Sequence, residues 1–225
     1  GLATGLMAGG SPDTPDYGSA GIRIQLTEKG VRNYQQVLEY FFSYIHMLKK
    51  EGYKEYLFYE QQTIAKLEEV FSDKGEGTWK AVSFANNLAF YPIEIAHRVE
   101  YHYGNPDPDA YLKTLSFIHP DNMLCVLSDS EQETPFEEFW YKSKYNYEEI
   151  KGDEYEVLKN PKFYSSLHLP DANPFLPKNA NLLPKPINKV NNPILLKKSK
   201  GLKLYYKQDT DFQRPKASYN YKIYF

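Results

Sequence analysis

The stretch IRIQLTEKGVRNYQQVLEYFFSYIHMLKK, residues 22–50, holds a strand pattern that is followed at once by a helix pattern. Residues 22–26 alternate between apolar and polar side chains, as a half-buried strand does. Thr27 can cap the N-terminus of the next helix, and Glu28 would lie in its first turn. Apolar residues then recur at helical spacing at Val31, Tyr34, Val37, Leu38, Phe41, Ile45 and Leu48. The pattern therefore predicts an amphipathic helix over residues 28–50, ended by Gly52.

The sequence around this stretch predicts further strands and helices. Residues 1–21 read as a strand, a turn rich in Gly, Pro and Asp, and the entry to the strand at 22–26. Apolar spacing and capping residues predict helices at about 55–71, 78–90, 92–103 and 107–118, and a strand at 123–128. The fold class that this order predicts is α+β, with helices packed on one face of a mostly antiparallel sheet.

The composition changes after residue 130. Residues 131–200 are rich in Asn and Lys, and prolines cluster at positions 161, 170, 174, 177, 184, 186 and 193. Such a stretch predicts a long extended connector. Strand patterns resume at 202–207 and 217–225 as a terminal hairpin. The predicted organisation is a domain over 1–130, a connector over 131–200 and the start of another domain over 201–225, with both chain ends expected to be cut from a longer protein.

Composition and charge argue against two classes of partner. The chain of 225 residues has a net charge of −2 with acidic and basic residues interspersed, whereas a nucleic-acid surface needs a basic excess on one face. No apolar run is long enough to cross a bilayer, so neither nucleic acid nor membrane is expected as a partner. The lone Cys125 lies in the apolar run MLCVL, residues 123–127, and is expected to be a small core residue.

The segment HRVEYH, residues 97–102, is the strongest candidate for a metal site, and it fails on spacing. The metallopeptidase motif H-x-x-E-H places its histidines one helical turn apart, on one face. His97 and His102 are five residues apart, which separates them by about 140° on a regular helix. Neither a metal site nor a catalytic residue is therefore predicted in this chain. The residues alone predict only an α+β region with a long connector.

Several short patterns occur in an order that resembles a known family. They are LTEKG (26–30), YFFSYI (40–45), YPIE (91–94), PDNM (120–123), WYKSKY (140–145), LHLPDANPFLP (167–177), KQD (207–209), Phe212 and PKA (215–217). Together they resemble the insulinase/pitrilysin (M16) family of zinc metallopeptidases. The WYKSKY segment matches a family W-Y-x-[ST]-x-Y pattern, and LHLPDANPFLP is similar to an L-x-L-P-x-x-N-x-F-I-P pattern.

This resemblance implies a place for the chain in a larger enzyme. Family members have four homologous α+β domains that enclose a chamber. Residues 1–130 would then be the C-terminal part of the second domain, residues 131–200 the connector, and residues 201–225 the first strands of the third domain. The family's H-x-x-E-H motif and distal Glu, which hold zinc and activate water, belong to the first domain. The resemblance thus implies a zinc metalloendopeptidase as the full-length parent and an inactive, zinc-free chain here.

The resemblance also implies a peptide-binding segment. A strand of the second domain anchors long peptides in family members, and by position it corresponds to Leu6, Met7, Ala8 and Gly9. Leu6 keeps the apolar type, whereas Ala8 stands where relatives carry Gly. The physical basis would be β-augmentation, in which an exposed sheet edge with small side chains accepts an added strand. The alternative for this segment is an ordinary edge strand that enters a turn.

Other interpretations stay open at this point. The parent protein could be a catalytically inactive homologue that serves assembly or peptide binding, or residues 1–225 could form an unrelated, self-contained binding module. Expected partners are peptide substrates and the remaining domains of the same chain, and a dimer is left open. The compartment would be periplasmic for a bacterial parent and cytosolic or organellar for a eukaryotic one.

Overall fold

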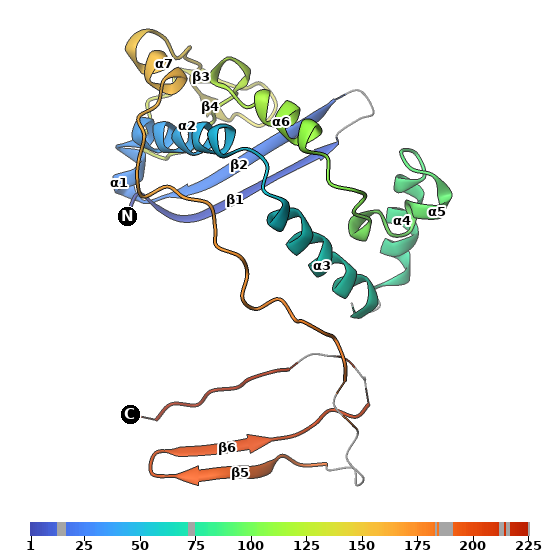
Figure 1. Cartoon of the computed structure of the whole chain (residues 1–225). Helices are drawn as coiled ribbons and strands as arrows, with labels where there is room; N and C mark the ends of the chain where they lie inside the picture. The colour runs from blue at the N-terminus through green and yellow to red at the C-terminus, as the bar shows by residue number, and fades with distance from the viewer. Residues whose placement is uncertain are drawn as a thin grey trace. The chain divides into compact units, whose positions relative to one another are not determined.

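The fold is seen in a computed structural model that describes residues 1–12, 17–71, 75–182, 184, 191–211, 214 and 217–224. The chain divides into two compact units, one made of residues 1–58 and 105–172, the other of residues 59–104 and 173–225. Within the described ranges there are seven α-helices and three two-stranded antiparallel sheets (Figure 1). The predicted α+β class and antiparallel pairing are confirmed, although the strands form three separate ladders instead of one sheet.

A β-hairpin opens the first unit. Strand β1 (Ala3–Pro12) pairs with β2 (Gly18–Leu26), with a register irregularity between Ala3 and Gly5. The predicted strand at 22–26 lies within β2. The turn predicted from Gly9 to Asp16 is wrong for residues 9–12, which belong to β1, and its residues 13–16 lie outside the described part. Strand β2 is therefore longer than the alternation indicates, and it pairs with the segment that precedes it in the chain.

The predicted single helix over residues 28–50 is wrong in its continuity. The structure has a short α1 (Glu28–Val31), and then a separate α2 (Tyr34–Glu51) that ends at Gly52 in a left-handed conformation, with φ 69°. The Thr27 hydroxyl accepts a hydrogen bond from the Gly30 N–H at 3.0 Å, so the predicted cap is confirmed. A Cβ on Gly30 would lie 1.9 Å from the Leu2 carbonyl oxygen, so the N-terminal segment packs directly on α1. Glycine is a poor helix former, and α1 ends one residue after it.

The core of the first unit lies on the inner face of α2. Phe42, Ile45 and Met47 of this helix are buried, together with Leu115 of α6 (Pro108–Ser116) and Leu158 of α7 (Gly152–Lys159). Helix α2 contacts both α6 and α7, and α7 also contacts the 3₁₀ turn η2 (Pro120–Asn122) (Figure 1). Of the residues whose spacing predicts this helix, only Ile45 is buried, and the others within α2 are half-buried, so the most buried positions are not the ones that the spacing selects.

The strand predicted at 123–128 is not formed. These residues have no regular secondary structure, and Leu124 and Val126 are 81% and 80% exposed. Cys125 is exposed as well, which corrects its assignment as a core residue. A strand is stable only against a neighbour, and no described strand pairs with this segment. A small hairpin follows, in which β3 (Phe136–Glu137) pairs with β4 (Lys144–Tyr145).

The segment after α7 lies against the helices of the first unit. The ring of Tyr164 meets that of Tyr40 edge-on at 4.5 Å, and the Lys50 ammonium lies 5.9 Å from the centre of the Phe163 ring. The Tyr56 hydroxyl donates to the Pro170 carbonyl at 2.6 Å. These side-chain contacts hold the connector on the surface although it has no regular secondary structure.

The second unit contains most of α3 (Glu55–Phe71), with α4 (Gly77–Asn87), α5 (Ile93–Ala96) and the 3₁₀ turn η1 (Val99–Tyr101). The predicted helix over 92–103 is therefore broken after Ala96. Arg98 links this segment to α3, because its Nε lies 2.9 Å from Glu69 Oε1 and its Nη2 donates to Oε2 at 2.9 Å.

The C-terminal hairpin consists of β5 (Ile194–Ser199) and β6 (Leu202–Tyr206). Its first strand lies within the stretch predicted as connector, so the structured region begins before residue 201. The strand predicted at 217–225 is not seen, since residues 217–224 have no regular secondary structure and Phe225 lies outside the described part. Among the described residues, no helix is both long and apolar enough to cross a bilayer.

Candidate functional site

The predicted binding residues Leu6, Met7, Ala8 and Gly9 are consecutive in β1. Their pairing with β2 places Leu6 opposite Ile24 and Ala8 opposite Ile22. The sheet has two strands, so the edge of β1 that faces away from β2 has no strand neighbour among the described residues. The four predicted binding residues thus lie next to one another along one open strand edge.

The side chains of this segment leave both faces of the strand accessible. Because side chains alternate along a strand, Leu6 and Ala8 lie on one face, and Met7 and Gly9 on the other. Leu6 and Met7 are each 66% exposed. A peptide on this edge would therefore meet one large apolar side chain and one small residue on each face.

The two glycines at the end of the segment differ in what surrounds them. A Cβ on Gly9 would meet no atom within 4 Å, whereas a Cβ on Gly10 would lie 2.9 Å from the Ser19 carbonyl oxygen. Gly10 is thus required for close pairing with β2. Gly9 instead faces open space on the same side of the strand as Met7.

The chemistry that this edge offers is recognition by the main chain. None of the residues from Leu6 to Gly9 carries an ionisable or nucleophilic side chain, so the segment supplies backbone N–H and C=O groups and apolar contacts. An extended peptide can add to such an edge as a further strand, with affinity from main-chain hydrogen bonds. Selectivity would then come from the apolar side chains of Leu6 and Met7.

The histidines of the HRVEYH segment do not lie on one regular helix. His97 is the C-cap of α5, and His102 follows η1. Within the ranges that the structure describes, no group of three or more His, Cys, Asp or Glu side chains is arranged to hold a metal ion. The donor set present in this part of the chain therefore does not fit a zinc site.

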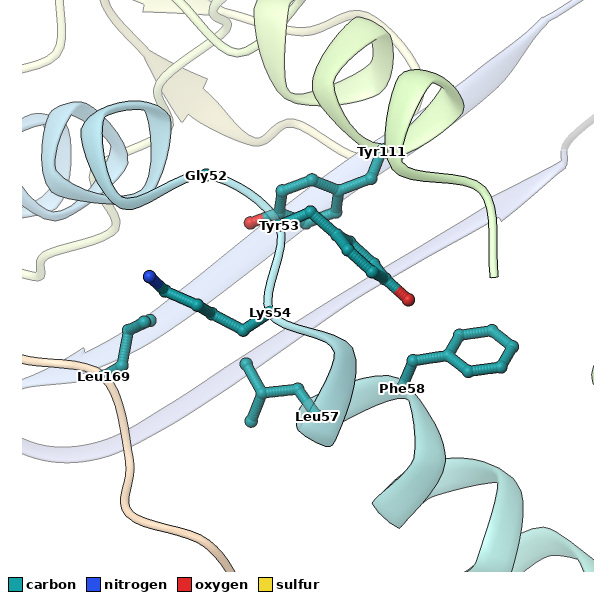
Figure 2. Close-up of a pocket in the computed structure, with 7 residues that line it drawn as sticks. All are labelled: Gly52, Tyr53, Lys54, Leu57, Phe58, Tyr111 and Leu169. Atoms are coloured by element: carbon teal, nitrogen blue, oxygen red, sulfur yellow. The ribbon is translucent and has the colours of Figure 1, made fainter. Parts of the chain in front are cut away.

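A pocket in the first unit is missed by sequence reasoning. It has a volume of about 210 Å³ and is lined by Gly52, Tyr53, Lys54, Leu57, Phe58, Tyr111 and Leu169 (Figure 2). The rings of Tyr53 and Tyr111 meet edge-on at 5.5 Å, and burial raises the pKa of the Tyr111 phenol. In the sequence, only the aromatic run after Gly52 points to this pocket, because its other walls come from α6 and from the segment after α7.

Comparisons with known proteins give a consistent set of matches. The family whose profile is described as "Middle or third domain of peptidase_M16" matches residues 70–225. The chain is 30% identical over 205 residues to insulin-degrading enzyme of Homo sapiens, which covers 90% of this chain and 20% of that protein. It is 30% identical over 224 residues to insulin-degrading enzyme-like 1, peroxisomal, of Arabidopsis thaliana, which covers 96% of this chain and 22% of that protein.

The fold has a solved counterpart in pitrilysin. Its crystal structure matches with a TM-score of 0.79 at 21% identity, over 95% of this chain and 23% of that one. The similarity in fold therefore extends through both units of the chain. In each of these comparisons, the chain spans about a fifth of the length of the protein that it matches.

Proposed function

This chain belongs to the M16 peptidase family, as part of its middle region, and we propose on that basis that it is a non-catalytic internal region of a zinc-dependent metalloendopeptidase. The longer protein would degrade peptides inside a closed chamber. This region would form part of the chamber wall and, through the open edge of β1, bind part of the substrate. A relative named "Putative zinc protease mug138" from Schizosaccharomyces pombe, 27% identical over 222 residues, supports zinc as the metal.

The zinc and the catalytic groups belong elsewhere in this proposal. The described residues do not bring together a set of metal ligands, so the site would lie in parts of the protein outside this chain. Residues 1–225 alone are then inactive. The proposal keeps the predicted division into residues 1–130, 131–200 and 201–225, in which β5 (Ile194–Ser199) would form the end of the connector.

The open edge of β1 is the observation that supports peptide binding. It combines an unpaired strand edge, two exposed apolar side chains and open space at Gly9. A peptide long enough to reach both β1 and a distant catalytic site gains from being bound at two places at once. The edge would therefore favour long substrates over short ones.

The test replaces Ala8 with Trp in the full-length protein. The bulky side chain would stand on the face that the added strand must share, so long peptides should bind about tenfold more weakly or worse, equivalent to roughly 1.4 kcal/mol, while short peptides are unaffected. Competition binding with long and short peptides measures the difference.

The matched control is Ala20→Trp on the paired strand, opposite Gly10. This variant adds the same bulk to the same face of the hairpin, away from the open edge of β1, and should leave the affinity for long peptides unchanged. An equal loss for long and short peptides in Ala8→Trp would remove the binding role. An equal loss of affinity for long peptides in Ala8→Trp and Ala20→Trp would also contradict binding at the β1 edge.

The second candidate is a catalytically inactive homologue, in which the same edge serves assembly or peptide binding without cleavage. The β1 edge favours it as much as it favours the enzyme, since it supplies binding and no chemistry. The sequence that carries the first domain discriminates, because an intact H-x-x-E-H motif is needed for hydrolysis.

A further inference from the structure

The turn between β3 and β4 presents three neighbouring aromatic side chains to solvent. Phe139, Trp140 and Tyr141 are 72%, 80% and 88% exposed. Soluble proteins seldom leave such a contiguous patch uncovered, and Trp and Tyr are enriched among the residues that dominate binding energy. These three residues, called the aromatic tip below, therefore have the composition of a docking surface.

The backbone of the turn is fixed by its own side chains. The Glu138 carboxylate accepts hydrogen bonds from the N–H groups of Trp140 at 2.5 Å and Tyr141 at 2.7 Å. The Glu138 N–H donates to the Ser143 carbonyl at 2.8 Å, and Lys142 takes the left-handed conformation with φ 57°. A turn held in this way loses little conformational entropy when a partner binds.

The charges of the turn are satisfied inside it. The Lys142 ammonium lies 3.8 Å from Glu137 Oε1 and 5.1 Å from the centre of the Phe139 ring. The rings of Phe139 and Trp140 meet edge-on at 5.1 Å, which braces the indole. The surface left for a partner is thus apolar, with an indole N–H and a phenol as polar groups, and it fits a concave apolar pocket better than a charged surface.

The size of the tip favours a partner in the same polypeptide. Three aromatic side chains bury at most about 750 Å², since each contributes about 150–250 Å². That area is within the range of a stable complex of separate proteins, but such a complex engages about 20–30 residues on each partner, so three residues fall short of it alone. Within one chain the effective concentration is high and a small contact suffices. The relatives are about five times as long as this chain, which leaves ample room for the pocket.

We infer that the aromatic tip, residues 139–141, inserts into an apolar pocket on a part of the same polypeptide outside residues 1–225. The contact anchors this region against another domain of the longer protein. The inference rests on the proposed function only in that it takes the chain to be part of a longer M16 protein. It concerns a different surface from the β1 edge.

Hydroxyl-radical footprinting of the full-length protein tests the contact. Oxidation of Trp140 and Tyr141, read by mass spectrometry, is compared between the folded protein and the same protein in concentrated urea. Aromatic residues at the centre of an interface are desolvated, so oxidation in the folded protein should be at least about tenfold slower. Rates within about twofold of the unfolded protein would overturn the inference, because the tip would then be as open as its exposure in this chain.

Dilution separates the same polypeptide from a second copy. A contact within one chain gives the same protection at every protein concentration, whereas a contact between copies weakens on dilution. Protection that is unchanged across a wide concentration range supports the inference. Protection that disappears on dilution assigns the tip to an interface between copies and overturns it.

Variants show whether the tip itself makes the contact. Trp140→Ser should restore the oxidation of Tyr141 towards its unfolded rate. Tyr147→Ser, which removes an aromatic residue that is 76% exposed just beyond the hairpin, should leave Tyr141 protected. Glu138→Ala keeps all three rings but removes the carboxylate that holds the turn, so it should give an intermediate loss. An equal effect of Trp140→Ser and Tyr147→Ser would contradict the inference.

The two proposals can fail separately. A full-length protein that binds zinc and cleaves peptides but leaves Trp140 fully reactive fails only the inference about the aromatic tip. A protein in which Trp140 is protected but neither zinc nor cleavage is found fails only the proposed function.

Discussion

Gly30 lies in close contact with the N-terminal segment, so the local packing leaves no room for a side chain there. Gly30→Ala would place a methyl group 1.9 Å from the Leu2 carbonyl oxygen, so either α1 or the N-terminal segment must move. Overpacking of this kind costs roughly 1–3 kcal/mol, and we expect faster hydrogen exchange of the amides around Thr27 and α1. Hydrogen-exchange mass spectrometry of the full-length protein measures the change.

Gly77 provides the matched control for this prediction. It is the first residue of α4, and a Cβ there would meet no atom within 4 Å. Gly77→Ala should leave α4 unchanged or stabilise it by about 0.4–1 kcal/mol, because alanine has fewer conformations to lose on folding. Unchanged exchange around α1 in Gly30→Ala would show that Leu2 does not pack on Gly30 in solution.

Single residues were predictable where the cause is local. The Thr27 cap follows from residue type and position, and it is confirmed by the hydrogen bond to the Gly30 N–H. The prediction that Cys125 is buried was wrong, because its burial would require a neighbouring strand, which no local pattern supplies. The helix assumed for His97 and His102 was wrong because α5 ends at Ala96, before either histidine.

The β3–β4 hairpin should depend on pH through Glu138. The N–H groups of Trp140 and Tyr141 bond to the charged carboxylate and hold the pKa of Glu138 below its usual range. A carboxyl whose pKa is lower in the folded than in the unfolded state stabilises the fold above the unfolded pKa. That stabilisation is lost as the pH falls through the folded pKa. We therefore expect the turn to loosen only at a pH below about 4.3, the ordinary value for Glu.

Carboxyl chemical shifts recorded by NMR during an acid titration measure the pKa of Glu138 directly. The backbone amide signals of Trp140 and Tyr141 should shift with the same midpoint. Glu138→Gln keeps the shape of the side chain but removes the titration, so the two amides should lose this midpoint. A Glu138 carboxyl that titrates at or above the ordinary value would contradict the hydrogen bonds to the turn.

Elements were predicted well where one chain segment determines them. Helix α3 (Glu55–Phe71) lies where spacing places it, and α6, which Asp107 caps, lies within the predicted range of about 107–118. Periodicity did not reveal the break between α1 and α2, because it reports which residues face the core and not the contact of Leu2 with Gly30. The predictions of strands at 123–128 and 217–225 were wrong, because a strand forms only when it pairs with a neighbouring strand.

For the whole molecule, the α+β class was predictable and the arrangement of the sheets was not. The candidate residues from Leu6 to Gly9 lie in a strand as expected, but the open edge of β1 depends on strand order, which the sequence of one strand does not specify. The pocket beside Tyr53 and Tyr111 was missed for the same reason, since residues far apart in sequence form it. Family membership supplies what local patterns cannot, namely a place for this region within a larger protein.

The most direct test of the proposed function measures zinc content and chelator-sensitive peptide cleavage in the full-length protein and in residues 1–225, side by side. Zinc and cleavage in the full-length protein, with neither in the shorter chain, are the predicted result, because the described residues bring no metal ligands together. Zinc binding or cleavage by residues 1–225 alone would contradict the account, and absence of both from the full-length protein would identify it as an inactive homologue.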